Sequence, residues 1–164
     1  MLFKRLKIMG TTTYGVAVGL VKDRGIYLSR RIDTPLFPKK WQFVNGAMKQ
    51  GENGHTASIR IAQDQTGLII AGSKLHYIGS ITIDAADEFY FVYLVHLKEH
   101  EVPTNNNGVT DRSDWKLFKM NAAVVLDLVP GLRHILFKLN KALLKVDLEI
   151  SLKKTEHDDE YDYI

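Results

Sequence analysis

The sequence contains no cysteine, which excludes disulfide bonds, thiol nucleophiles and thiolate metal sites. It has no apolar run of membrane-spanning length, and its basic start, residues 1–10, lacks the apolar segment of a secretory signal. A net charge of +3 is too small to predict nucleic-acid binding, although it suits a small anionic ligand. We therefore expect a cytoplasmic protein with a small-molecule partner and with neither a nucleic acid nor a membrane as partner.

The composition is that of a globular domain. Hydrophobic residues make up 45% of the 164 positions and charged residues 25%. We expect one domain over residues 1–147 and a loose acidic C-terminal tail over residues 148–164, with its charge concentrated in Asp158–Asp162. The tail could fold back over a basic site or contact a second copy of the chain in a homodimer, and the sequence leaves both alternatives open.

The stretch from Trp41 to Leu68 organises the rest of the chain. An aromatic, strand-like segment leads into a glycine-containing loop over residues 45–54, and a helix-like run follows. Asn53 is a suitable N-cap for that helix, and Gly67 suits a left-handed C-cap. The sequence therefore predicts a strand, a loop and a helix over residues 55–66.

The spacing within this stretch resembles the signature of the Nudix hydrolases, Gly-x5-Glu-x7-Arg-Glu-(apolar)-x-Glu-Glu-x-Gly-(apolar), called the box below. The matching positions are Gly46, Glu52, Arg60, Gly67 and Leu68. These hydrolases cleave nucleoside diphosphates linked to another group. The resemblance implies an α/β fold, the Nudix α/β/α sandwich with a mixed central sheet.

Three glutamate positions of the signature hold other residues here, namely Ile61, Asp64 and Gln65. In the family these glutamates share one helix face and hold a magnesium ion. Here one carboxylate is shortened, one is an uncharged amide, and one is replaced by an apolar group that cannot bind metal. Because ligand charge tunes the affinity for such ions, we expect Mg²⁺ or Mn²⁺ to bind weakly, if at all.

The resemblance also implies roles for the residues that remain. Glu52, Arg60, Asp64 and Gln65 form the expected catalytic group, in which Glu52 and Arg60 join the loop to the helix through a salt bridge. Metal ligands would come from Asp64, the Gly46 carbonyl and Glu52. An alternative for Asp64 is an ordinary surface ion pair with Arg60 at i, i+4 spacing, which is worth little.

Substrate contacts are predicted at two further positions. Arg31 ends a predicted strand and can hold a phosphate bidentately, although a solvated strand end is the alternative. Trp41, at the start of the organising stretch, is the second predicted contact. The resemblance also implies that an extra acid of the metal site can come from the region before Trp115, where Asp111 and Asp114 are the candidates; the alternative for both is loop solubility or a cap.

Other segments predict the surrounding architecture. The segment over residues 89–97 is aromatic or β-branched throughout, so it belongs at the middle of a sheet that helices cover on both faces. A short helix is expected over residues 122–129, with Asn121 as its N-cap, and an amphipathic helix over residues 132–146. Further strands are predicted over residues 14–21, 26–31 and 75–83.

Two functions are compatible with this pattern. The first is a divergent Nudix-type hydrolase that cleaves the diphosphate linkage of a nucleoside diphosphate derivative by metal-activated water. The alternative is a catalytically impaired Nudix-fold module that binds or senses a nucleotide. The sequence has no Gly-x-Ser-x-Gly elbow, P-loop or dinucleotide GxGxxG motif. Its histidines are scattered and do not predict a zinc site.

Overall fold

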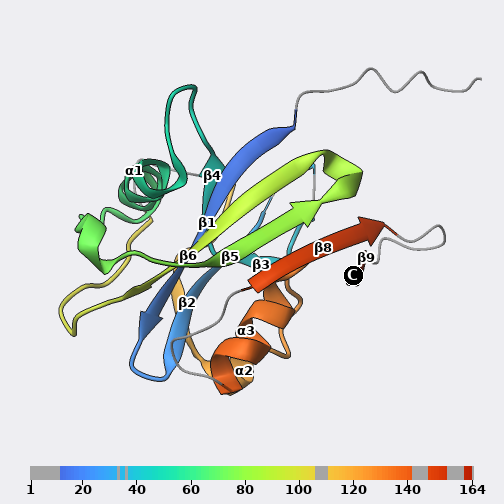
Figure 1. Cartoon of the computed structure of the whole chain (residues 1–164). Helices are drawn as coiled ribbons and strands as arrows, with labels where there is room; N and C mark the ends of the chain where they lie inside the picture. The colour runs from blue at the N-terminus through green and yellow to red at the C-terminus, as the bar shows by residue number, and fades with distance from the viewer. Residues whose placement is uncertain are drawn as a thin grey trace, which may run out of the picture.

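A mixed sheet lies at the centre of the molecule, with α1 on one face and α2 and α3 on the other (Figure 1). The computed structural model describes residues 12–32, 34–35, 37–105, 111–141, 148–154 and 161–163. Its strands are β1 Thr13–Lys22, β2 Gly25–Arg30, β3 Trp41–Gln42, β4 Val44–Ala47, β5 His76–Ile83, β6 Glu88–His96, β7 Lys116–Lys119, β8 Leu148–Lys154 and β9 Tyr161–Tyr163. Its helices are α1 Gly54–Thr66, α2 Met120–Ala123 and α3 Leu132–Lys141, with short 3-10 turns η1 Gly72–Lys74 and η2 Asp84–Ala86.

Within the described residues, the main strand order is β3-β2-β1-β6-β5-β8-β9. Strand β1 pairs in parallel with β6, from Thr13↔Glu88 to Val21↔His96. On its other edge β1 pairs with β4 and then with β2, both antiparallel. The expected α/β/α sandwich with a mixed central sheet is confirmed, and β6 has the central position that its apolar sequence predicts.

Strand β1 supplies both hydrophobic cores because its side chains alternate between the faces of the sheet. Val16, Val18 and Leu20 are fully buried on the face that α1 covers. Val21 and the half-buried Ala17 belong to the opposite core, beneath α2 and α3. The two helical layers are thus tied to one strand, and any site at its edge is fixed relative to both.

Helix α1 begins and ends where its capping residues predict. The Asn53 side chain accepts a hydrogen bond from the Thr56 N–H at 2.8 Å, which satisfies one of the unpaired donors of the first turn. At the other end Gly67 adopts a left-handed conformation with φ of 72° and donates its N–H to the Gln63 carbonyl. The helix predicted over residues 55–66 is therefore confirmed.

The helix predicted over residues 122–129 is wrong, because α2 ends at Ala123 and has no side-chain N-cap hydrogen bond. Segment 127–129 instead pairs with Trp41. The Trp41 N–H donates to the Asp127 carbonyl at 2.8 Å. The Trp41 carbonyl accepts from the Val129 N–H at 3.0 Å. This bridge to a distant strand replaces the local helical hydrogen bonds, and a new helix, α3, starts at Leu132 as predicted.

The sheet continues past residue 147, the expected boundary between domain and tail. Strand β8 pairs in parallel with β5, and β9 pairs antiparallel with β8. The two strands have no clear signal in the sequence, and residues 158–160 of the acidic run lie outside the described residues. The boundary itself stays a prediction. In the part of the chain that the structure describes, no helix has both the length and the apolar character to cross a membrane.

Candidate functional site

The loop between β4 and α1 is held by a bidentate ion pair. The Glu52 carboxylate accepts hydrogen bonds from Arg60 Nε at 2.6 Å and from Arg60 Nη2 at 2.7 Å. It also accepts from the Lys49 N–H at 2.8 Å, and Arg60 Nη2 reaches the Ala47 carbonyl at 3.2 Å. The Arg60 hydrogen bonds, followed by that from Lys49, lower the pKa of Glu52 to about 2. Both Glu52 oxygens are thus occupied in bracing the loop against the helix.

Asp64 lies one helical turn after Arg60 and interacts with it from a distance. Its Oδ2 is 3.8 Å from Arg60 Nη1, and 59% of its side chain is exposed. This geometry is that of the surface ion pair that the sequence offered as the alternative. A pair so exposed contributes little to stability.

Ile61 takes the space beside the box glycine. Its side chain is 3% exposed and packs in the core between α1 and the sheet. A Cβ atom on Gly46 would lie 3.1 Å from Ile61 Cδ1, so the two residues are in close contact. An aliphatic group therefore fills the position where the Nudix signature has a glutamate.

The main-chain carbonyl that faces α1 is that of Asn45, the residue before the box glycine. Gln65 Nε2 donates to it at 2.6 Å. Gly46 lies opposite Val16 in the β1–β4 ladder. Two residues further along, Met48 lies opposite Tyr14, and the Met48 N–H donates to the Tyr14 carbonyl. Hydrogen-bonded pairs recur every second residue in such a ladder, so the Gly46 carbonyl is directed toward β1 rather than toward the helix. Residue type gives no signal for this contact, because the Asn45 acceptor is a main-chain carbonyl.

Gln65 is anchored on both its side chain and its main chain. Besides its bond to Asn45, its main-chain carbonyl accepts from Trp115 Nε1 at 3.3 Å. Its Oε1 is buried and has no hydrogen-bond partner among the described residues. An uncharged amide thus stands where the family signature places a carboxylate, with its N–H turned toward the Asn45 carbonyl.

These positions do not fit a magnesium or manganese ion. Such ions take several oxygen ligands and favour carboxylates. Within the described residues, no three His, Asp or Glu side chains gather into a group that could hold a metal. Of the two candidate helpers, Asp111 pairs with Arg112 Nε at 3.0 Å and Asp114 is exposed. The donor set that remains is one exposed carboxylate and one amide oxygen.

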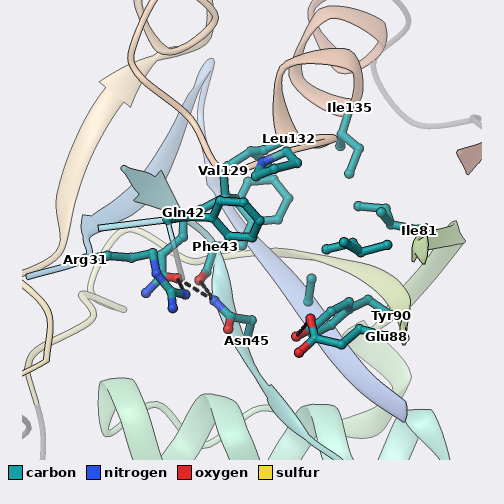
Figure 2. A pocket seen from close by; sticks show the side chains of 14 residues that line it. Arg31, Gln42, Phe43, Asn45, Ile81, Glu88, Tyr90, Val129, Leu132 and Ile135 are labelled. Carbon is teal, nitrogen blue, oxygen red and sulfur yellow. Dashed lines mark hydrogen bonds between the residues drawn. The ribbon is translucent and has the colours of Figure 1, made fainter. Parts of the chain in front are cut away.

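A cavity of about 170 Å³ lies on the face of the sheet that α3 covers, and five residues supply its polar lining. Its apolar wall combines sheet residues such as Phe43 and Ile81 with Val129, Leu132 and Ile135 from α3 and the segment before it. Figure 2 shows Arg31 on one side and Glu88 with Tyr90 on the other, with Asn45 between them. The polar groups are Arg31, Gln42, Asn45, Glu88 and Tyr90.

The Arg31 side of the cavity is ordered by a short hydrogen-bond chain. Arg31 Nη1 donates to Gln42 Oε1 at 2.7 Å, and Arg31 Nε donates to Thr34 Oγ1 at 3.1 Å. Asn45 Nδ2 donates to the same Gln42 oxygen at 3.0 Å. Burial lowers the pKa of Arg31, while Tyr90 acts in the opposite direction. Arg31 is therefore a half-buried cation at the cavity wall, and its contact with a phosphate stays a prediction.

The opposite side holds a carboxylate and a phenol, which the sequence analysis did not identify. The Tyr90 O–H donates to Glu88 Oε2 at 3.0 Å, and burial followed by the Glu88 charge raises the pKa of Tyr90. The Tyr90 ring lies against Gly15, where an added Cβ would be 2.7 Å from ring atom Cε1. A glycine opposite a strand tyrosine is the signal that could have revealed this close contact.

Trp41 lies outside the cavity lining. Its ring packs edge-on against Phe118, with ring centroids 4.9 Å apart, and Lys116 Nζ lies 5.9 Å from the Trp41 ring centre. Together with its backbone bonds to the 127–129 segment, these contacts make it an anchor between β3 and the chain that follows α2. A substrate contact at Trp41 stays a prediction.

Comparison with known proteins agrees with this architecture. The profile of the NUDIX domain family matches residues 11–139. A MutT protein from Bacillus halodurans superposes with a TM-score of 0.71 at 16% identity, covering 93% of this chain and 96% of that one. A NUDIX hydrolase from Nitrosomonas europaea gives a TM-score of 0.66 at 12% identity, covering 87% and 80%.

A third solved structure contains a ligand. It is the NUDIX domain of Shewanella oneidensis NrtR in complex with ADP ribose, with a TM-score of 0.68 at 12% identity, covering 82% of this chain and 90% of that one. No curated protein sequence matches the chain. At these identities the solved structures show a shared fold.

Proposed function

Because the chain belongs to the NUDIX domain family, we propose that it binds a nucleoside diphosphate derivative in the cavity between its sheet and α3. The observation that carries this proposal is the placement of a guanidinium, Arg31, at the wall of an otherwise mostly apolar cavity (Figure 2). An apolar pocket with a few convergent polar groups is the usual form of a small-molecule site. The ADP ribose in the NrtR domain supports a nucleotide derivative as the ligand class.

The ligand's phosphates would lie at the Arg31 side. A guanidinium can hold a phosphate bidentately, and Gln42 already fixes one of its edges. Partial burial strengthens such a contact, because the local dielectric constant is lower than that of water. Asn45 also lines the cavity, and its main-chain carbonyl accepts from the Gln65 side chain, so the box would lie next to the same phosphates.

Binding with little or no hydrolysis fits the box better than catalysis does. A box helix that holds Ile61 against Gly46 and turns the Gln65 amide N–H toward a carbonyl presents no negative cluster. With both Glu52 oxygens engaged by Arg60 and Lys49, this part of the box would serve as a structural brace between the β4–α1 loop and the helix. The role of the domain would then be to sense or retain the ligand.

Hydrolysis of the diphosphate linkage is the second candidate. Family membership favours it, and so does the buried Gln65 Oε1, an oxygen with no partner in the described part of the chain. This candidate needs a divalent cation that Asp64 and Gln65 would have to attract without further carboxylates. A cytoplasmic location and a homodimer likewise stay predictions.

Calorimetric titration tests the proposal. Nucleotide sugars, dinucleotides and nucleoside triphosphates are titrated in EDTA and again with Mg²⁺, and product formation is followed in parallel by chromatography. We expect binding of at least one diphosphate compound in EDTA, with no turnover in Mg²⁺. Turnover that needs Mg²⁺ and disappears in Asp64→Ala would instead support the hydrolase.

Arg31→Met is the matching variant, with Arg30→Met as its control, since Arg30 is exposed and lies outside the cavity. Loss of a hydrogen bond between charged groups should weaken binding about 10- to 100-fold in Arg31→Met and leave Arg30→Met close to wild type. Equal effects of the two substitutions would remove Arg31 from the site. Failure of every nucleotide to bind at millimolar concentration would overturn the proposal.

A further inference from the structure

We propose that Glu88, oriented by Tyr90, determines specificity by requiring two adjacent hydrogen-bond donors on the uncharged part of the ligand. This inference rests on the proposed function and adds the kind of nucleotide that the cavity accepts. Two parts of a nucleotide offer such a donor pair: the N1–H and N2–H₂ edge of guanine, and the 2′,3′-diol of ribose. The shared chemistry is a pair of neighbouring N–H or O–H groups that face one carboxylate.

The first support is the chemistry that this side of the cavity presents. A carboxylate accepts hydrogen bonds and donates none. The Tyr90 hydroxyl has committed its proton to Glu88 Oε2, at 3.0 Å, so its oxygen is also left as an acceptor. Both groups line the cavity, and together they form a wall that accepts hydrogen bonds from a ligand and offers it no donor.

The second support is that Glu88 keeps one oxygen for a ligand. In the part of the chain that the structure describes, the Tyr90 hydroxyl is the one donor within hydrogen-bond distance of the Glu88 carboxylate. It binds Oε2, which leaves Oε1 and the remaining lone pairs of Oε2. A pair of adjacent donors can engage both oxygens of a carboxylate at once, which is the strongest arrangement available to it.

The third support is the polarity across the cavity. Arg31 and Glu88 line the same cavity from opposite sides, as Figure 2 shows. A negative phosphate is attracted to Arg31 and repelled by Glu88, so the ligand can enter in only one orientation. The uncharged end of the nucleotide must then face Glu88 and Tyr90, which accept hydrogen bonds from its N–H or O–H groups.

The fourth support is the precision with which Tyr90 is held. The Tyr90 ring lies so close to the Gly15 backbone that a single added carbon would stand 2.7 Å from the ring. Burial, followed by the Glu88 charge, raises the pKa of Tyr90 above its ordinary value, so the hydroxyl keeps the proton that it donates to Glu88. The Tyr90 hydroxyl therefore holds the Glu88 carboxylate in one position. A carboxylate held in this way disfavours ligands that cannot donate a hydrogen bond to it.

The cavity size agrees with a compact group at this end. Its volume of about 170 Å³ is close to the roughly 150 Å³ of an engineered cavity that accepts benzene. A base or a ribose fits such a space, whereas a whole dinucleotide would have to extend out past Arg31. The selectivity between nucleotides would then depend on whether the base or the ribose enters the cavity.

The test is a set of matched diphosphates titrated in EDTA. GDP against IDP removes the N2–H₂ donor of the base, and ADP against 2′-deoxy-ADP removes one hydroxyl of the ribose. We expect wild-type protein to lose about 10- to 100-fold in affinity across one of these two pairs, because the analogue leaves the Glu88 carboxylate partly unsatisfied. A loss confined to the first pair identifies the base edge, and a loss confined to the second identifies the diol.

Glu88→Gln should reduce that ratio to near 1, while Glu99→Gln, the same change at an exposed position outside the cavity, should leave it unchanged. Tyr90→Phe, which keeps the ring and removes the hydroxyl, should lower the ratio in the same direction but by less. Thermal unfolding of each variant shows whether the fold is intact, and Tyr90→Phe carries the test if Glu88→Gln does not fold.

Three outcomes are distinguishable. If nucleotides bind but neither pair differs in the wild type, or Glu88→Gln and Glu99→Gln behave alike, the specificity role is overturned and the proposed function survives. If one pair differs and Glu88→Gln erases the difference, the inference is supported. If no nucleotide binds the wild type at all, both the proposed function and this inference fail.

Discussion

Gln65 Nε2 donates to the Asn45 carbonyl at 2.6 Å, and this single bond connects the C-terminal turn of α1 to the strand that lines the cavity. Asn45 connects α1 with the cavity wall: its carbonyl accepts from Gln65, and its side chain donates to Gln42 Oε1, which also accepts from Arg31. The substituted box position therefore has a structural partner of its own. A carboxylate there would face a carbonyl oxygen without a proton or a cation between them.

The first prediction concerns that bond. Gln65→Ala removes the donor and leaves a partly buried carbonyl unpaired, so the free energy of unfolding should fall by about 1–2 kcal/mol. Gln50→Ala, the same change at an exposed position of the loop before α1, is the control and should change stability by less than about 0.5 kcal/mol. Urea unfolding measures both, and equal effects would show that the bond adds nothing.

The second prediction concerns the lost metal site. In EDTA, Ile61→Glu should cost about 3–5 kcal/mol, because it buries an unpaired charge in the core beside Gly46. In the double variant Ile61→Glu/Gln65→Glu, the two new carboxylates would share one helix face with Asp64, so Mg²⁺ should restore part of the lost stability. Thermal unfolding with and without Mg²⁺ measures this restoration.

Ile61→Leu conserves size and should cost less than about 1.5 kcal/mol, with no response to Mg²⁺. If the double variant also gains turnover of a diphosphate, by about 10²-fold or more, the site retains its catalytic geometry. A double variant that ignores Mg²⁺ in both stability and turnover would mean that the site geometry itself has been lost.

The third prediction follows from the low pKa of Glu52. Its pKa is about 2 in the folded protein against an ordinary value of 4.5, so its ion pair with Arg60 stabilises the fold fully above 4.5. That contribution is lost as the pH falls from 4.5 through about 2. The difference in unfolding free energy between wild type and Glu52→Gln should therefore be largest near neutral pH and shrink in acid. Chemical unfolding at stepped pH measures it, and a constant difference would rule out this linkage.

The fourth prediction concerns the end of α1. Gly67 has a φ of 72°, where a side chain is strained, so Gly67→Ala should cost about 1 kcal/mol. Asn tolerates this conformation better, and Gly67→Asn should cost less than the alanine change. Thermal unfolding ranks the two, and the reverse order would point to a role of Gly67 other than its backbone angle.

The fifth prediction concerns the support beneath Tyr90. Gly15→Ala places a carbon 2.7 Å from the Tyr90 ring and 2.9 Å from the Gly46 carbonyl oxygen, so it should displace the ring and weaken ligand binding by about tenfold. Gly51→Ala is the control, because an added Cβ there meets nothing within 4 Å. It strains the backbone at φ of 83° without touching the cavity, and its affinity should match wild type. Unchanged affinity in Gly15→Ala would show that ligand binding does not depend on the position of the Tyr90 ring.

Local signals in the sequence predicted the parts of the fold that local interactions determine. Helix α1 has its N-cap, C-cap and buried face within one stretch, and the Glu52–Arg60 pair lies within the same stretch, at the spacing of the signature. The central strand β6 was predicted from its own apolar character. Each of these depends on residues close together in the chain.

The parts that were missed depend on distant partners. The helix expected over residues 122–129 gave way to backbone bonds with Trp41, and nothing near that segment in the sequence indicates such a partner. In our proposal, the Glu88–Tyr90 pair acts as a recognition element only because Arg31, which follows β2 and is distant in the chain, lines the same cavity. The contact between Gln65 and Asn45 has no signal in the sequence, because its acceptor is a main-chain carbonyl, which residue type does not reveal.

The parallel pairing of β1 with β6 also bears on how the chain is made. Thr13 meets Glu88 and Val21 meets His96, so the central ladder cannot close until the ribosome has released most of the domain. The β1–β2 hairpin can form early, which leaves the other edge of β1 open while it waits for its partner. During synthesis that open edge would be the segment most exposed to mispairing, and a pause in translation before residue 96 would prolong the exposure.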